Sequence, residues 1–174
     1  TWRKLHVGAN PDNGEIQVVV LTENSVSDDA VVKGMLAQIE QTLLSCAADG
    51  AYDKRKVYDV LNAHSPEVEI LIPPRKNAHI WQHGNSKEER LKRDENLRYI
   101  RTHGRYQWKK DAGYHIRSLA ETIIFRLKTI FGESAGTVLG RIVSANAATY
   151  PRFEVGAVKV LTATIAAAVT AAEA

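Results

Sequence analysis

Cysteine is nearly absent from the sequence, because Cys46 is the single one in 174 residues. No disulfide can form within the chain, and this composition is typical of a protein from a reducing compartment. The neighbouring residues Leu43, Leu44 and Ala47 are apolar, which favours a small core residue over a reactive thiol. The Ser45-Cys46 pair has no histidine nearby in the sequence and is therefore not a candidate nucleophilic site.

The sequence also lacks a long apolar run. Its longest uncharged apolar stretch, 160–172, is rich in Ala and Thr and falls short of the roughly 20 residues that a membrane-spanning helix needs. Arg3, Lys4 and His6 interrupt the start of the chain, so no secretory leader is predicted. We expect a protein that does not enter a membrane.

The overall composition, with 44% hydrophobic and 25% charged residues, is that of a globular domain. The length suits one domain with a substantial core. The net charge of +3 hides an uneven distribution: positions 22–69 hold nine acidic and four basic residues, whereas positions 101–128 hold seven basic and two acidic ones. Tyr106, Trp108 and Tyr114 interleave the basic segment, a pattern typical of proteins that bind a polyanion such as nucleic acid.

Hydrophobic patterning predicts an α/β layer fold. Residues 1–9 and 15–23 are rich in β-formers and flank the turn sequence NPDNG, which predicts a β-hairpin. A helix is expected after residues 27–29, then a strand at 43–48, a helix at about 54–63 and a strand at 67–72. The charged segment 75–113, with a helix within 87–104, is interpreted as an insertion packed loosely on the core.

The stretch YHIRSLAETIIFRLK, residues 114–128, predicts an amphipathic helix. Tyr114, Arg117, Glu121 and Lys128 border its apolar face. Glu121 could form an ion pair with Arg117, as on many helices, or could serve as a functional carboxylate. The apolar face itself is expected to pack on the core and comprises Ala120, Ile123, Ile124, Leu127, Ile130 and Phe131.

Asp49 directly follows the predicted strand 43–48. Ligands gather at the carboxyl ends of strands in doubly wound sheets, and Gly50 lets the chain turn away there. An acid at this place, with a second acid on a packed helix, could hold Mg²⁺, which takes carboxylate and phosphate oxygens. Two such ions about 4 Å apart can promote phosphodiester cleavage. Alternatively, Asp49 caps the turn in DGAYD.

The spacing of Tyr114, Arg117, Glu121 and Lys128 matches the Tyr-Arg-Glu-Lys signature of bacterial insertion-sequence DDE transposases. Residues 1–132 resemble this family along their length, and 133–174 form a divergent C-terminal tail to which no function is assigned. The stretches that carry the resemblance, in the family's order, are TWRKLHVG, ADGAYDKRKVYDVL, IPPRKNA and RTHGRYQWKKDAGYHIRSLAETIIFRLKTIFG.

The resemblance implies a ribonuclease H-like fold, a mixed sheet flanked by helices, in which three acids hold two divalent ions, Mg²⁺ or Mn²⁺. Asp49 matches the second acid and Glu121 the third. Arg117 and Lys128 would contact the DNA backbone at the transposon end, with Tyr114 supporting them. The implied activity is DNA cleavage and strand transfer in the bacterial cytoplasm, near the nucleoid. Charge alone suggests that Lys109, Lys110 and Arg105 bind further phosphates of the DNA backbone.

The family's first acid has no counterpart in this sequence. It lies on a central strand upstream of the stretch that resembles TWRKLHVG. Asp12 falls in the hairpin turn, and Asp28 and Asp29 open a helix, so none of them is expected to replace it. We therefore expect a truncated, catalytically incomplete copy with an open sheet. If the chain is compact alone, the strand 43–48 must pair directly with the hairpin.

Other functions remain open. A non-catalytic DNA-binding or inhibitory fragment could occupy transposon ends, form homo-oligomers or pair with full-length transposase. A nucleotide-binding α/β module is a further alternative, although the sequence has no glycine-rich phosphate loop. His79 and His83 have a spacing used by zinc ligands, but a zinc site needs three or four. Trp81 and Trp108 could stack on bases or anchor a small core.

Overall fold

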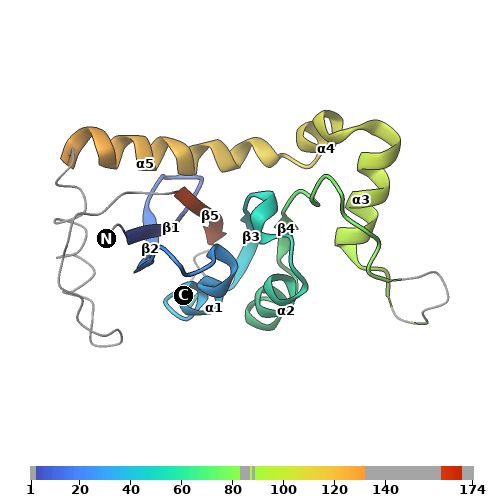
Figure 1. Ribbon diagram of the computed structural model, residues 1–174, viewed down its shortest axis with the longest axis horizontal. Coiled ribbons are helices and arrows are strands. Elements are labelled where there is room, and N and C mark those ends of the chain that lie inside the picture. The colour runs from blue at the N-terminus through green and yellow to red at the C-terminus, as the bar shows by residue number, and fades with distance from the viewer. Residues whose placement is uncertain (1–2, 83–86, 88, 132–161, 170–174) are drawn as a thin grey trace, which may run out of the picture.

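The computed structural model describes residues 3–82, 87, 89–131 and 162–169. Figure 1 shows one mixed sheet with helices on both sides. In chain order the elements are β1 (Arg3–Ala9), β2 (Ile16–Glu23), η1 (Asp28–Ala30), α1 (Val32–Leu36), β3 (Leu43–Ala47), η2 (Gly50–Tyr52), α2 (Arg55–His64), β4 (Glu69–Leu71), α3 (Lys92–His103), α4 (Arg105–Asp111), η3 (Tyr114–Arg117), α5 (Ser118–Phe131) and β5 (Thr162–Val169), where η marks a 3₁₀ helix.

The strand order among the described residues is β2-β1-β5-β3-β4. The predicted hairpin is confirmed, because β1 and β2 pair antiparallel. β5 lies beside β1 in parallel and beside β3 in antiparallel orientation, and β3 pairs with β4 in parallel. The expectation that the strand 43–48 pairs directly with the hairpin is therefore wrong. A strand from the C-terminal tail lies between them, and it satisfies backbone groups that would otherwise be open on both sides.

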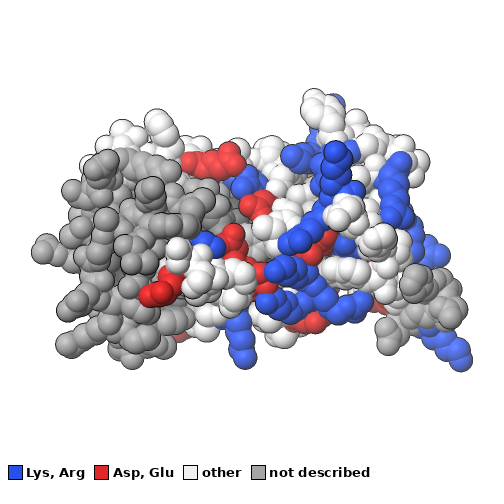
Figure 2. Space-filling view, viewed as in Figure 1, with Lys and Arg blue, Asp and Glu red and all other residues white. Residues whose placement is uncertain are grey.

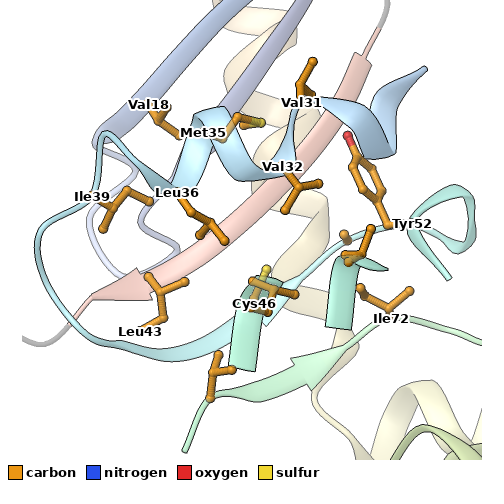
Figure 3. Packing of buried hydrophobic residues seen from close by; sticks show 14 of the residues in the cluster. Val18, Val31, Val32, Met35, Leu36, Ile39, Leu43, Cys46, Tyr52 and Ile72 are labelled. Carbon is orange, nitrogen blue, oxygen red and sulfur yellow. The ribbon is translucent and has the colours of Figure 1, made fainter. Parts of the chain in front are cut away.

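α1 and α2 cover one face of the sheet and α5 the other (Figure 1). The larger core cluster lies on the α1 and α2 side, where Met35 and Leu36 of α1 meet Leu43 and Cys46 of β3 (Figure 3). Cys46 is fully buried, and burial raises the pKa of its thiol to about 12. The prediction of a core cysteine is confirmed. The predicted α/β class is also confirmed at the level of a mixed sheet with flanking helices.

A second cluster joins β1 to α5. Leu5 and Val7 on β1 pack against Ile123 and Ile124 of α5, since alternate residues of a strand face the same side. Ala120 is fully buried as well, so this part of the predicted apolar face is confirmed. Ile130, at 70% exposed, does not belong to the face, and that prediction is wrong. The side chain of Phe131 lies outside the described part of the structure.

The signature segment is not one continuous α-helix. Tyr114 to Arg117 form the 3₁₀ turn η3, and the α-helix begins at Ser118. Gly113 precedes the turn with a φ of 64°, a left-handed conformation that glycine adopts without strain. The tighter turn changes the direction of the side chains before Ser118 relative to an uninterrupted helix, and it places Tyr114 against the sheet rather than along the edge of α5.

A third cluster packs α4 and η3 against the ends of β3 and β4. Trp108 and Tyr114 lie with ring centroids 5.6 Å apart, against Ala47 and Leu71. Trp108 is buried, so it anchors this small core, and its proposed stacking on bases is wrong because the ring has no free face at the surface.

The insertion does not pack loosely, contrary to the prediction from its charged sequence. Arg93 and Asp94 at the start of α3 are buried, and the Arg93 guanidinium donates two 2.9 Å hydrogen bonds to the carboxylate of Asp53. Arg93 also bonds Asp94 at 3.0 Å. The charges compensate one another, which permits their burial. No helix in the described residues is long and apolar enough to cross a membrane.

The unfolding free energy is expected to fall steeply below about pH 4. Burial alone would raise the pKa of Asp29, but the ammonium groups of Lys54 and Lys56 outweigh it and hold that pKa below its usual range. A depressed native pKa stabilises the fold above the unfolded value of about 3.9 and loses this contribution as the pH falls through the native value. Urea unfolding between pH 2 and 7 should show this loss. The loss of unfolding free energy at low pH should be smaller in Asp29→Asn. It should be unchanged in Asp12→Asn, which alters an exposed turn residue. Equal pH profiles for the two variants would contradict the role assigned to Asp29.

Candidate active site

Asp49 lies where β3 ends and the chain turns into η2. Its Oδ1 accepts a 2.8 Å hydrogen bond from the backbone N–H of Ala51, so the capping role that the sequence left open is present. The turn is tight, because a Cβ at Gly50 would lie 3.2 Å from the carbonyl oxygen of Pro73. The capping bond uses one carboxylate oxygen and leaves Oδ2 directed at another partner.

That partner is Arg117, which lies between the two candidate acids. Its Nη2 is 3.6 Å from Oδ2 of Asp49, and its Nη1 bonds Oε1 of Glu121. The Arg117–Glu121 ion pair considered in the sequence is therefore present as well. Because one guanidinium reaches both carboxylates, Asp49 and Glu121 converge on the same place from different elements.

Arg117 stays charged at this place. Burial alone would lower its pKa, but the hydrogen bond to Glu121 and the charge of Asp49 outweigh this effect and raise the pKa. Its Nε is buried and has no hydrogen-bond partner among the described residues. The side chain thus balances two carboxylates that are themselves accessible, with exposed fractions of 33% for Asp49 and 59% for Glu121.

Tyr114 fastens η3 to the end of β3. Its hydroxyl donates a 3.0 Å hydrogen bond to the carbonyl oxygen of Ala48, the residue before Asp49. Burial raises the pKa of this phenol to about 12, so it remains a donor at neutral pH. Tyr114 therefore fixes Arg117 relative to Asp49 through the backbone on both sides.

An open groove of about 540 Å³ runs beside these residues. It brings Lys109, Lys110, Tyr114, Arg117 and Glu121 together, five of the eight residues that the sequence suggested. The Lys109 ammonium lies 5.3 Å from the centroid of the Tyr114 ring, within the range of a cation–π contact. The remaining lining residues are Tyr106, His115 and Ser118.

Of the other three candidates, Asp49 and Arg105 do not line the groove. Arg105 donates a 2.6 Å hydrogen bond to the carbonyl oxygen of Pro74, which ties α4 to the segment after β4. Lys128 lies on α5, about two turns beyond Glu121. Its side chain falls outside the described part of the structure.

Arg75 supports the turn that carries Asp49, and the sequence interpretation did not assign it a role. Its Nε and Nη2 donate 3.1 Å hydrogen bonds to the carbonyl oxygens of Gly50 and Ala51. Its backbone N–H donates a 2.9 Å bond to Oδ2 of Asp53. The stretch IPPRKNA, which resembled the family, was the available signal for this contact.

On the face shown in Figure 2, Lys and Arg side chains gather over the side of the molecule that carries β4, α3 and α4. Asp and Glu side chains lie nearer the centre of this face. Lys and Arg side chains thus predominate on this side of the face, and such a field attracts polyanions.

The donor chemistry of the site suits one hard cation. Asp49 and Glu121 offer carboxylate oxygens, the ligands that Mg²⁺ shares with substrate phosphates. The residues that the structure describes contain no group of three or more His, Cys, Asp or Glu side chains placed to hold a metal. The Arg117 guanidinium lies between the carboxylates of Asp49 and Glu121, and the three-acid, two-ion set implied by the resemblance has no counterpart among the described residues.

Trp81 and His79, the other candidates among the described residues, do not line the groove. Trp81 packs edge-on against Tyr58, with ring centroids 5.3 Å apart, and the Arg93 guanidinium lies 4.0 Å from its ring centroid. These contacts make it an anchor for the insertion. His79 is exposed, and His83 lies outside the described residues.

Residues 1–147 match the family described as Transposase DDE domain. The match covers most of the 174 residues, so the chain belongs to this family of transposases. Its function is accordingly DNA transposition, its partner is DNA, and divalent metal ions are the cofactors that this family generally uses. No solved structure matches the chain.

Proposed function

We propose that the chain is the catalytic core of a bacterial insertion-sequence transposase of the Tyr-Arg-Glu-Lys branch, with a ribonuclease H-like arrangement, acting in the cytoplasm on the DNA ends of its element. One observation carries the proposal: Asp49 and Glu121 meet on Arg117 beside a groove lined by Lys109 and Lys110. Carboxylates for a cation and ammonium groups for phosphates thus lie together, which is the arrangement that phosphodiester chemistry requires.

In this proposal Asp49 and Glu121 would hold a magnesium ion, which would polarise a phosphate oxygen of the DNA. Arg117, already charged and near both acids, binds the phosphate next to the cleaved bond. Lys109 and Lys110 position the adjoining backbone along the groove, and Lys128 extends the contact along α5. Tyr114 holds η3 against the end of β3, so that Arg117 and Asp49 stay at a fixed separation.

Nicking of supercoiled plasmid DNA that carries the element's ends tests the proposal. Because the first acid has no counterpart in the sequence, the chain is expected to convert supercoiled to open-circular DNA only slowly, with Mg²⁺ or Mn²⁺, and to lose this residual activity in EDTA. A rival function is supported by the lack of a three-acid group among the described residues: a non-catalytic fragment that binds DNA ends or pairs with complete transposase. DNA binding without any metal-dependent nicking would favour the non-catalytic function and contradict the catalytic proposal.

Replacing Lys109 and Lys110 together by alanine is expected to weaken DNA binding for all sequences alike. Each lost phosphate contact lowers the slope of log K against log salt by about 1, so the double variant should lower it by about 2. Fluorescence anisotropy with labelled duplex DNA at several salt concentrations measures the slope.

Lys33→Ala with Lys87→Ala is the matched control, since both lysines are exposed and do not line the groove. An unchanged slope in the Lys109 and Lys110 variant would show that DNA does not lie along the groove.

A further inference from the structure

β5 joins two half-sheets that do not otherwise pair in the described residues. One half is the β1–β2 hairpin and the other is the β3–β4 pair. Ala166 of β5 is the Cα partner of Ala9 on β1 and also of Ala47 on β3. The continuity of the sheet therefore depends on this one strand.

The candidate active site depends on the same strand, because its two acids belong to different halves. β3 leads directly into Asp49. Glu121 lies on α5, and α5 packs through Ile123 and Ile124 on β1. A strand that holds β1 beside β3 thus supports the position of Glu121 near Asp49, in addition to the hydrogen bond from Tyr114 to Ala48.

The connection to β5 does not restrict it to its own chain. The 30 residues 132–161 separate it from the end of α5, and a segment of that length can span up to about 100 Å. A domain of this size has a radius of gyration of roughly 16 Å. β5 also lies beyond the residues 1–147 that match the family.

Recognition of β5 by its neighbours uses groups that every copy of the chain has. The pairing with β1 and β3 is a backbone ladder, in which Thr162 to Ala166 lie beside Leu5 to Ala9 and Ala166 to Val169 lie beside Ala47 to Leu43. The same residues of a second copy can form the same ladder. Exchange of identical elements between copies needs no new contacts, which makes it a low-cost route to a dimer.

We propose that β5 is an exchangeable strand: residues 162–169 of a second copy of this chain insert between β1 and β3 and complete the sheet that carries Asp49 and Glu121. The partner is a second copy of the chain. The interaction surface consists of the edge of β1 and the edge of β3 that lie on either side of β5. A strand on its own tether competes at an effective concentration on the order of millimolar, so exchange is favoured when chains fold together at high concentration.

The single cysteine allows a direct test. Cys46 on β3 is the Cα partner of position 167 on β5, and directly opposed residues of antiparallel strands lie at Cα separations of about 4.5 to 5.5 Å, within the range of a disulfide. The donor chain carries Cys46→Ala with Ala167→Cys and a mass tag, and the acceptor is the unaltered chain. The two are unfolded in urea, mixed and refolded together in a glutathione redox buffer, because Cys46 is inaccessible in the folded chain.

A covalent donor–acceptor dimer on non-reducing gels is the expected result. Its share should about double when the acceptor concentration doubles, as long as the share is small. The control donor carries Cys46→Ala with Thr162→Cys and should give no dimer above background, since Thr162 lies opposite Leu5 on the other side of the strand.

A third chain, Ala167→Cys with Cys46 retained, shows whether β5 lies beside β3 at all. An internal disulfide in this chain without any donor–acceptor dimer would mean that β5 stays in its own chain, and the proposal would be overturned. Failure of both disulfides would overturn it too, because β5 would not be the neighbour of β3. These readouts involve no DNA, so they do not depend on the transposase chemistry.

Discussion

Metal-dependent nicking is expected to fall more than about 100-fold when Asp49 is changed to Asn or Glu121 to Gln. Loss of an outer-shell partner of a metal ligand already costs about 10- to 100-fold, and loss of the ligand itself costs more. Both changes remove a charge and keep the shape. Asn at position 49 can still accept the hydrogen bond from Ala51, and Gln at position 121 keeps the start of α5. Gel assays measure the nicking, and electron paramagnetic resonance measures Mn²⁺ bound to the protein.

Asp59→Asn is the matched control, because Asp59 is an exposed acid on α2 that does not line the groove. It should retain nicking and Mn²⁺ binding. Full nicking in both amide variants would falsify the assignment of the two carboxylates as ligands. Retained Mn²⁺ binding with lost nicking would instead assign them to DNA positioning.

Arg93→Met is expected to lower the unfolding free energy by about 3 to 5 kcal/mol. The Arg93 side chain is 3% exposed and compensates the carboxylates of Asp53 and Asp94, each 1% exposed. Without the guanidinium, both carboxylates remain buried and uncompensated, although Asp53 keeps its bond from Arg75. Equilibrium unfolding in urea at pH 7 measures the effect.

The same helix provides the control. Arg98 pairs with Glu95 at 2.6 Å, with exposed fractions of 41% and 44%, and exposed pairs contribute at most about 1 kcal/mol. Arg98→Met should therefore have a small effect. Equal losses in Arg93→Met and Arg98→Met would mean that burial of the ion pair does not matter.

The secondary structure of the N-terminal half follows from local patterns. The hairpin is predicted because two stretches rich in β-formers flank a turn sequence. α2 and β4 are predicted because a helical segment is followed by a strand that ends at two prolines. The insertion is harder to predict, because a charged sequence usually forms a solvated surface. Nothing local to Arg93 indicates that its partner is Asp53, 40 residues earlier.

The candidate site is predictable to the extent that residue types and spacing carry it. The Tyr-Arg-Glu-Lys spacing predicts Arg117 and Glu121 as site residues, and the position directly after a strand predicts Asp49. The structure brings these three residues together. The spacing does not show that Tyr114 belongs to a 3₁₀ turn and bonds the carbonyl of Ala48, since that contact joins segments 66 residues apart. The stretch IPPRKNA points to the segment of Arg75, but it does not show that the guanidinium bonds the carbonyl oxygens of Gly50 and Ala51.

β5 could not be predicted from the sequence. Its residues TATIAAAV lack the alternation of a half-buried strand, and alanine has a low strand propensity. The position of β5 is determined by its pairing with β1 on one side and β3 on the other. This tertiary effect outweighs the low strand propensity of its residues.

The order of synthesis gives this arrangement a consequence for the newly made chain. A ribosome releases β1, β2, β3 and β4 well before residues 162–169 emerge, so the nascent protein carries two unpaired strand edges for the time needed to make the remaining residues. At about 5 to 20 residues per second this interval lasts several seconds. Open edges of this kind are where nascent chains aggregate, and early binding of a chaperone to these edges would therefore raise the yield of native protein.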